Sequence, residues 1–372
     1  MTEKKKSLIK DADLAEKDQE IQLLKSALKK LEKEVINDRT IRREIFKLPM
    51  VKPVLPNWLI SENPKQLIHS PGVPVILCSD WHGGEVVSQS EVYGVNSYSL
   101  EIMAKRAKTL IQTSINILKH NSNILTPDYP GVVFCLLGDM ISGDIHDELR
   151  ETNQMQTLPT LMYMVNILIE CIDTLINEFG NVLVPCVTGN HGRNTLKMRA
   201  KERAYTSYDW LLYQMLEFHY KQKYDKVKDK PITFLVSLAP DVHFQVFNTK
   251  FLATHGDTLG KGGDGIIGCV GPIIRGDQKT RSRNLQIGLP YDIMLLGHYH
   301  QLMWHSRFIA NGSLIGYNEF ASNVLRANYE APKQALFIVH PDHGINYQVN
   351  VLVEHSQKSN EASWVSWNSV SA

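Results

Sequence analysis

Histidine, aspartate and asparagine recur in five short motifs, each of which follows an apolar run. Carboxylate and amide oxygens and neutral imidazole nitrogens are the ligands of divalent cations in mixed oxygen and nitrogen sites. One such motif is weak evidence, because a single histidine after a strand is more often hydrogen-bonded than metal-bound. The five together supply the ligand types that a dinuclear metal centre requires. In chain order they are Asp80-Trp81-His82, Gly138-Asp139, Gly189-Asn190-His191, His255-Gly256-Asp257 and Gly297-His298-Tyr299-His300.

A dinuclear centre needs one carboxylate that bridges two cations about 3.5–4 Å apart. Asp139 can take this role. Asp80, His82 and one distal histidine can complete one metal site, and Asn190, His255 and another distal histidine can complete the other. The DxH and HxH spacings suit this, because alternate residues of an extended segment point to the same side. Two such cations activate water and clamp an in-line displacement at phosphorus, which predicts phosphoester hydrolysis.

The apolar runs before the motifs indicate how the chain brings them together. The early runs alternate with helical patterns at 99–120, 155–178 and 196–222, which predicts an α/β domain with buried strands. Ligands bind beyond the carboxyl ends of strands in such domains. Later strands have no helices between them and predict a second, more antiparallel sheet packed face to face with the first. These strands are expected near 232–238, 242–248, 306–318, 334–341 and 345–352.

The order DxH, GD, GNH, HG and GHxH resembles the calcineurin-like metallophosphoesterases, including phage-type members, over about residues 73–316. The resemblance implies an α/β fold in which two mixed β-sheets pack as a sandwich flanked by helices. It implies two divalent metal ions, Mn²⁺ by preference with Fe, Zn, Ni or Mg as alternatives, and a metal-bridging hydroxide as nucleophile. It also implies that His191 is catalytic and faces the leaving group. The implied ligands are Asp80, His82, Asp139 and His300 for the first metal, and Asp139, Asn190, His255 and His298 for the second.

Two features depart from the family pattern. The family places Asp or Glu directly after the GNH histidine, where it helps to orient the imidazole, but this chain continues with Gly192 and Arg193. The Arg193 guanidinium suits a phosphate oxygen, which makes Arg193 a second candidate catalytic residue. The alternative is an ordinary surface arginine. The segment after Asp139 also lacks the GDxxDRG form of the protein Ser/Thr phosphatases, which disfavours a phosphoprotein substrate.

The segment between His255 and His298 is first glycine-rich and then basic. Lys279, Arg281 and Arg283 are its candidate substrate-binding residues, because clustered cations bind phosphates beyond the scissile one. The alternative is a solvated helix face. We therefore expect a phosphodiesterase that acts on DNA or RNA, resembling the repair exonucleases of the family. A phosphomonoesterase or nucleotide hydrolase is the alternative, and a degenerate binding protein is disfavoured because every expected ligand position is filled.

Four segments are predicted along the chain: a helical arm at 1–46, a Pro-rich linker at 47–72, the metallophosphoesterase domain at 73–355 and a C-terminal tail at 356–372. Apolar residues recur every seven positions in the arm, from Leu14 to Val35. This pattern predicts a coiled coil of roughly three heptads, and hence a homo-oligomer. A single amphipathic helix packed on the domain is the alternative.

Composition narrows the class of protein. Hydrophobic residues make up 43% of the 372 and charged residues 21%, with a formal net charge of +1, so bulk charge does not indicate a nucleic-acid partner. The five cysteines form no CxxC pair, which favours buried thiols in a reducing compartment. The N-terminal sequence does not resemble a secretory signal, and no apolar run is long enough to cross a membrane. We therefore expect a cytoplasmic protein with no membrane partner.

Overall fold

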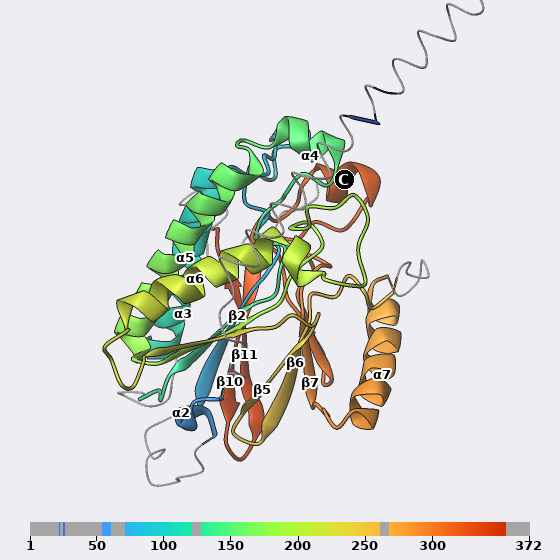
Figure 1. Cartoon of the computed structure of the whole chain (residues 1–372). Helices are drawn as coiled ribbons and strands as arrows, with labels where there is room; N and C mark the ends of the chain where they lie inside the picture. Colours follow the sequence, from blue (N-terminus) through green and yellow to red (C-terminus); the bar gives the residue numbers. More distant parts are fainter. Residues whose placement is uncertain are drawn as a thin grey trace, which may run out of the picture. The chain divides into compact units, whose positions relative to one another are not determined.

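The computed structural model (Figure 1) describes residues 22, 25, 26, 54–60, 71–120, 128–260 and 268–354. The chain divides into two units, Met1–Lys52 and Pro53–Ala372. In the first unit the described residues are Gln22, Lys25 and Ser26, and all three are helical. The rest of the predicted coiled-coil arm, much of the linker and the predicted tail lie outside the described residues.

Six strands form the first sheet, in the order β11-β10-β1-β2-β3-β4. The strands from β1 to β4 run parallel. On the other side of β1, β10 pairs antiparallel with β1, and β11 pairs antiparallel with β10. The side chains of β1, β2 and β3 are buried on both faces, as is typical of a parallel sheet that is covered on both sides. The strands are β1 (Val73–Cys78), β2 (Val132–Leu136), β3 (Val182–Cys186), β4 (Ile232–Val236), β10 (Lys333–His340) and β11 (Gly344–Leu352).

Five strands form the second sheet, in the order β5-β6-β7-β9-β8. Parallel β6, β7 and β9 lie in the middle, and antiparallel β5 and β8 flank them, so this sheet is also mixed. The strands are β5 (Val242–Val246), β6 (Thr249–Ala253), β7 (Ile293–Leu296), β8 (Met303–Trp304) and β9 (Phe308–Ala310).

Alternation along the strands divides the core into layers. In β1, Ile76 packs against helices, whereas Val75 belongs to a cluster shared with Phe251 of the second sheet. The two sheets therefore pack face to face. Helices α3, α5 and α6 cover the outer face of the first sheet, and Ile273 of α7 packs on the outer face of the second (Figure 1). The predicted fold class, two mixed sheets flanked by helices, is confirmed. The helices are α3 (Leu100–His120), α5 (Thr157–Phe179), α6 (Tyr208–Lys223) and α7 (Val270–Gln286).

The predicted division of strands between the sheets is wrong for three of them. β4, β10 and β11 were expected in the second sheet but belong to the first. β4 lies parallel to β3, and β10 pairs antiparallel with β1 from Val73↔Val339 to Ile76↔Leu336. The apolar pattern of a strand specifies that it is buried, but it does not specify which exposed sheet edge it joins.

The predicted helix at 196–222 begins later than expected. α6 starts at Tyr208, and Ser207 caps it by accepting a hydrogen bond from the Trp210 amide at 3.5 Å. The preceding residues form a loop that ends in a short 3₁₀ turn at Ala204–Thr206. The cap fixes the start of the helix and leaves the residues before it free to form a loop beside Asn190.

One described helix, α5, has the length and the apolar composition of a membrane span. Its residues from Thr160 to Ile176 include ten that are buried, and it contacts α3, α6 and β3. This is the environment of a core helix.

Candidate metal centre

The candidate ligands follow the carboxyl ends of strands that run in the same direction. Asp80, Asp139 and Asn190 follow the parallel strands β1, β2 and β3, and His255 and His298 follow the parallel pair β6 and β7. Parallel strands end at one edge of a sheet, and the two sheets pack face to face. The fold therefore brings side chains from five separate motifs into one place.

The backbone at this edge is strained. Asp80, His82, Asp139, His298 and His300 have φ angles of 54°, 47°, 50°, 70° and 55°, in the left-handed region that side-chain-bearing residues rarely adopt. Each such residue costs of order 1–3 kcal/mol, and such strain clusters at functional sites. Five of the nine described non-glycine residues with positive φ are candidate ligands, so the strain is concentrated where the metal centre is expected.

Neighbouring turns hold this strained backbone in place. The amides of Asp80 and His82 donate to the carbonyl oxygens of Gly138 and Asp139 at 3.1 and 3.0 Å, and the Leu314 amide donates to the Asp80 carbonyl at 3.1 Å. These bonds tie the first two motifs and the segment after β9 into one assembly. The turns thus fix one another, which makes the ligand positions preorganised.

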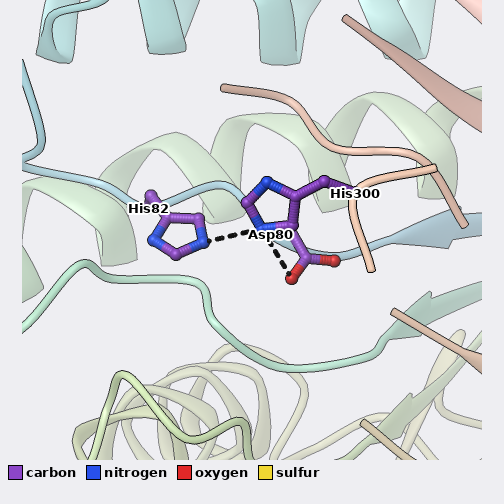
Figure 2. Close-up of side chains that lie close together, drawn as sticks. All are labelled: Asp80, His82 and His300. Atoms are coloured by element: carbon purple, nitrogen blue, oxygen red, sulfur yellow. Dashed lines mark hydrogen bonds and ion pairs between the residues drawn. The ribbon is translucent and has the colours of Figure 1, made fainter. Parts of the chain in front are cut away.

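Asp80, His82 and His300 form the first group of ligand atoms (Figure 2). His300 Nε2 lies 3.4 Å from Asp80 Oδ1 and 3.1 Å from His82 Nε2. Two imidazole nitrogens that face each other at this distance share at most one proton, and a cation satisfies both lone pairs. The Asp80 carboxylate is fully buried and accepts the His298 backbone amide at 3.0 Å, so it is held toward the same point.

Asp139, His255 and His298 form a second group, and Asn190 lies beside it. His255 Nδ1 donates to the Leu137 carbonyl at 2.7 Å, which leaves Nε2 to face Asp139 Oδ2 at 3.0 Å and Asn190 Oδ1 at 3.2 Å. In the neutral imidazole this nitrogen carries a lone pair directed at two oxygen atoms. Burial alone lowers the pKa of His255, but the Asp139 carboxylate outweighs burial and raises that pKa to about 10. The arrangement therefore requires a cation, either a proton or a metal ion.

His82 and Asp139 together connect the two groups. A third group of ligand atoms, all within 4.8 Å of one another, comprises His82, Asp139 and His191, so Asp139 and His82 each belong to two groups. The clustered His and Asp side chains fit a dinuclear metal site in which Asp139 is positioned to bridge. His300 lies with the Asp80 group and His298 with the Asp139 group, the same division that the family resemblance implies.

His191 lies beside both groups without an acidic neighbour in the sequence. Its backbone amide donates to Asp139 Oδ1 at 2.6 Å, and its Nδ1 lies 3.2 Å from the Ser142 carbonyl oxygen. Because a carbonyl only accepts, Nδ1 carries the proton and Nε2 carries the lone pair. Burial, followed by the positive charge of His82, lowers the pKa of His191 to about 4. The imidazole is thus neutral at neutral pH.

Glu85 supports His82 and was missed by the sequence reasoning. Glu85 Oε2 lies 3.3 Å from His82 Nδ1, on the side of the ring away from His300, and Glu85 Oε1 accepts from Asn318 Nδ2 at 2.8 Å. Burial raises the pKa of a carboxyl group, but the contact with His82 prevails and lowers the pKa of Glu85 to about 2. A carboxylate behind a metal-binding imidazole fixes its orientation and raises its basicity. The i, i+3 spacing of His82 and Glu85 is the signal that the sequence offered.

Asp209, the second residue of α6, is fully buried beneath the centre and was also missed. Its carboxylate accepts the backbone amides of Asp139 at 3.1 Å, Met140 at 3.2 Å and Gly189 at 2.9 Å. One side chain thus joins the turn after β2 to the turn after β3. Burial and the nearby Asp139 carboxylate raise the pKa of Asp209 to about 6. Its distance in sequence from both turns left no local signal.

Arg193, the second candidate catalytic residue, is directed at its own loop. Its guanidinium donates to the carbonyl oxygens of Asn190, Thr195 and Leu196 at 2.8, 3.0 and 3.4 Å. These three bonds close the loop that follows Asn190. The structure therefore places Arg193 next to a candidate ligand, as a residue that shapes the backbone there.

The three candidate substrate residues of α7, Lys279, Arg281 and Arg283, lie on the helix that packs on the outer face of the second sheet. Arg281 donates to the carbonyl oxygens of Tyr291 and Asp292, which precede β7, whereas His298 follows β7 at its other end. Arg283 is paired with Asp241 at 2.6 Å. The Lys279 side chain is exposed. Both arginines are thus engaged by other residues of the same domain. Arg281 in addition lies at the end of β7 opposite to the candidate metal centre.

Comparisons with known proteins give no match to a family model and no match to a curated protein. Among solved structures, this chain is similar to a single mutant of Vps29 from Entamoeba histolytica. The match covers 74% of this chain and 98% of the Vps29 chain, at 13% sequence identity and a TM-score of 0.30. This chain is also similar to a dimetal phosphatase from Danio rerio. That match covers 77% of this chain and 100% of the phosphatase chain, at 10% sequence identity and a TM-score of 0.34. A third similar structure is a putative 5′-nucleotidase from Staphylococcus aureus. The match covers 78% of this chain and 56% of the nucleotidase chain, at 11% sequence identity and a TM-score of 0.35.

Proposed function

We propose that this chain is a phosphoester hydrolase that depends on two divalent metal ions, with phosphodiesters as its substrates. The observation that supports this most strongly is the position of Asp139. Its carboxylate belongs to the His82 and His191 group and to the His255 and His298 group at once. One carboxylate shared between two sets of oxygen and nitrogen ligands is the arrangement that a two-metal centre requires.

Each proposed ligand set matches the chemistry of the ions. Asp80, His82, Asp139 and His300 are proposed to hold one ion, and Asn190, His255, His298 and the shared Asp139 the other. Two carboxylates and one amide oxygen combine with four imidazoles, a set that suits Mn²⁺, Fe or Zn better than Ca²⁺. When bound, the two ions lower the pKa of water and neutralise charge that develops on phosphoryl oxygens.

The protein's own residues fix the geometry of this chemistry. Asp209 and the strained turns hold the ligands, and Glu85 orients His82. His191 carries its proton on Nδ1, toward Ser142, so its Nε2 accepts a hydrogen bond or a proton at neutral pH. We propose that His191 orients the attacking water or accepts its proton. This role differs from proton donation to the leaving group, which requires an imidazolium.

The test is hydrolysis by protein that has been stripped with chelator and reloaded separately with Mn²⁺, Fe²⁺, Zn²⁺, Ni²⁺ and Mg²⁺. Bis(p-nitrophenyl) phosphate reports diesterase activity and p-nitrophenyl phosphate reports monoesterase activity. We expect metal-dependent turnover of the diester and two metal ions per chain by elemental analysis. Faster turnover of the monoester would transfer the assignment to a phosphomonoesterase. Absence of metal-dependent turnover of both would overturn the proposed function.

A further inference from the structure

The loop that follows Asn190 and His191 is strongly basic. Residues 193–203 read RNTLKMRAKER and contain five basic residues and one acidic residue, whereas the whole chain has a net charge of +1. Positive charge is thus concentrated in this loop, and the rest of the chain carries a small net negative charge that nearly cancels it. A local concentration of cations attracts polyanions even when a protein is neutral overall.

Both ends of this loop are fixed beside the candidate metal centre. The Asn194 amide donates to the Thr206 carbonyl at 2.8 Å, and the Tyr208 amide donates to the Gly192 carbonyl at 2.6 Å. Arg203 forms an ion pair with Asp257, which follows His255, at 2.9 Å. The loop therefore leaves and returns next to the proposed ligands of the second metal ion (Figure 1, the yellow-green trace before α6).

Three of the five cations are free to bind a ligand. Arg193 and Arg203 are engaged by the protein, the first by carbonyl oxygens and the second by Asp257. The side chains of Lys197, Arg199 and Lys201 are exposed, and none of these side chains has an ion pair or a hydrogen bond with another residue in the described parts of the chain. The Lys197 backbone carbonyl accepts a hydrogen bond from the Thr195 hydroxyl at 2.8 Å. Like charges this close in sequence repel one another, and an anionic ligand relieves that repulsion.

The free cations adjoin the place where a substrate phosphate would bind. Arg199 lines a small cavity together with Asn190, Arg193 and Arg203. Asn190 is a proposed ligand of the second metal ion, so Arg199 lies close to the candidate centre. Lys197 and Lys201 stand two residues to either side of Arg199, and residues four apart in a loop can lie up to about 13 Å from each other. The cations can therefore contact successive phosphates of one chain.

We propose that Lys197, Arg199 and Lys201 bind the phosphate backbone of a single-stranded nucleic acid and hold it across the metal centre. This inference rests on the proposed function and names its substrate class. Leu196 and Met198 alternate with the cations and are 79% and 45% exposed, which supplies apolar contacts for sugars and bases. A flexible single strand suits the centre better than a rigid duplex, because Asp80, Asp139 and His255 are buried at its base.

The chain offers a matched control. Lys226, Lys228 and Lys230 have the same spacing as Lys197, Arg199 and Lys201, are exposed, and precede β4. β4 is parallel to β3, and its first residue pairs with Val182 at the start of β3, whereas Asn190 follows the end of β3. A triple Ala variant of either set removes three positive charges. The loop variant removes them close to the candidate centre, and the control variant removes them at the opposite end of the strands.

The experiment measures binding of a fluorescent 20-nucleotide single-stranded DNA between 50 and 200 mM KCl by anisotropy. It uses full-length protein carrying Asp139→Asn, so that the probe stays intact, with and without each triple substitution. Each phosphate contact on a single strand contributes about −0.7 to the salt slope, so the loop variant should lose up to about 2 units of slope. The affinity of the parent should then fall roughly 20-fold more than that of the loop variant over this salt range. The control variant should retain the parental slope.

Two results overturn the inference, and both differ from failure of the proposed function. Equal salt slopes for the loop and control variants would show that the loop does not contact the strand. Hydrolysis of the bis-aryl diester by a protein that does not bind the oligonucleotide would remove nucleic acid as substrate and leave the hydrolase intact. With Asp139 restored, the loop variant should lose at least tenfold more kcat/KM on the oligonucleotide than on the bis-aryl diester.

Discussion

The carboxylate of Asp209 lies where a side chain at position 192 would project. A Cβ atom placed on Gly192 would lie 2.8 Å from the Asp209 carboxyl carbon and 2.9 Å from its Oδ1. Glycine is therefore required at 192 because α6 delivers a carboxylate into the same space. The sequence has glycine where an acidic residue was expected after His191, and the structure provides an acidic group there from a residue 17 positions later.

Asp209→Asn tests whether this carboxylate positions the metal-bearing turns. Its two oxygens accept three backbone amides, so an amide side chain places an N–H group against at least one donor. We expect a loss of about 1–3 kcal/mol in the free energy of unfolding, measured by urea denaturation. We also expect weaker binding of the metal ions, measured by competition with a fluorescent chelator. Asp229→Asn, at an exposed position before β4, is the control, and equal effects of the two substitutions would contradict a positioning role.

Asp139→Asn removes the shared carboxylate. An amide offers one neutral oxygen in place of two charged ones, so it does not offset the charge of two ions. We expect kcat for the bis-aryl diester to fall by roughly 10³-fold or more, corresponding to about 4 kcal/mol of lost stabilisation. Circular dichroism should show an unchanged fold, and Asp147→Asn on the neighbouring surface should retain activity. Near-parental turnover with two ions bound would refute the bridging assignment.

Glu85→Gln tests the support behind His82. The substitution preserves the shape of the side chain and removes the charge that faces His82 Nδ1. Loss of such a partner behind a metal-binding histidine typically lowers metal affinity 10–100-fold. The measurement is metal affinity by isothermal titration calorimetry, with the exposed Glu91→Gln variant as control. An affinity equal to that of the control would show that Glu85 is dispensable for metal binding.

Metal ions and protons are expected to compete for the centre. Without metal, the pKa of His255 is about 10 and that of His82 about 9, because Asp139 and Glu85 outweigh the effect of burial. Both values exceed the usual value of about 6.5 in an unfolded chain. The stability that these protons contribute is fully present below about pH 6.5 and is lost as pH rises through 9 and 10.

The Tm of chelator-treated protein should therefore fall between pH 7 and 10, whereas metal-loaded protein should show a smaller decrease. Metal binding at pH 7 should also release protons, and its affinity should increase with pH. Differential scanning fluorimetry and titration in a weakly buffered pH indicator measure these effects. Parallel Tm curves for the two forms would show that the metal does not replace these protons. The exposed His120→Gln variant should behave as the parent does.

Deletion of residues 1–46 tests the predicted coiled coil. Roughly three heptads suffice to hold a dimer or trimer, and every proposed ligand lies in the second unit, which begins at Pro53. Light scattering should therefore report a smaller assembly, and turnover of the bis-aryl diester per chain should be retained. An unchanged mass would exclude the arm as the oligomerisation element.

The sequence by itself determined which side chains are available for metal chemistry and where they lie along the chain. Asp80, Asp139 and His255 each follow an apolar run, and both features are local, because burial and strand periodicity can be recognised within a few residues. The mixed two-sheet class followed from the same runs. Asp139 belongs to two groups of ligand atoms, since the carboxyl ends of parallel strands meet at one edge, and its role as a bridge stays a prediction.

Only the tertiary structure decided the contacts between distant segments. β10 joins β1 across more than 250 residues, Asp209 fills the space above Gly192, and Arg281 lies at the far end of β7 from His298. A strand pattern does not name its neighbour, and a charged residue does not show whether its partner is a substrate or a carbonyl group of the same domain. Such pairings depend on packing over the whole fold. For this reason only the structure showed that Arg193, Arg199 and Arg203 of the loop at 193–203 lie beside Asn190, a candidate metal ligand.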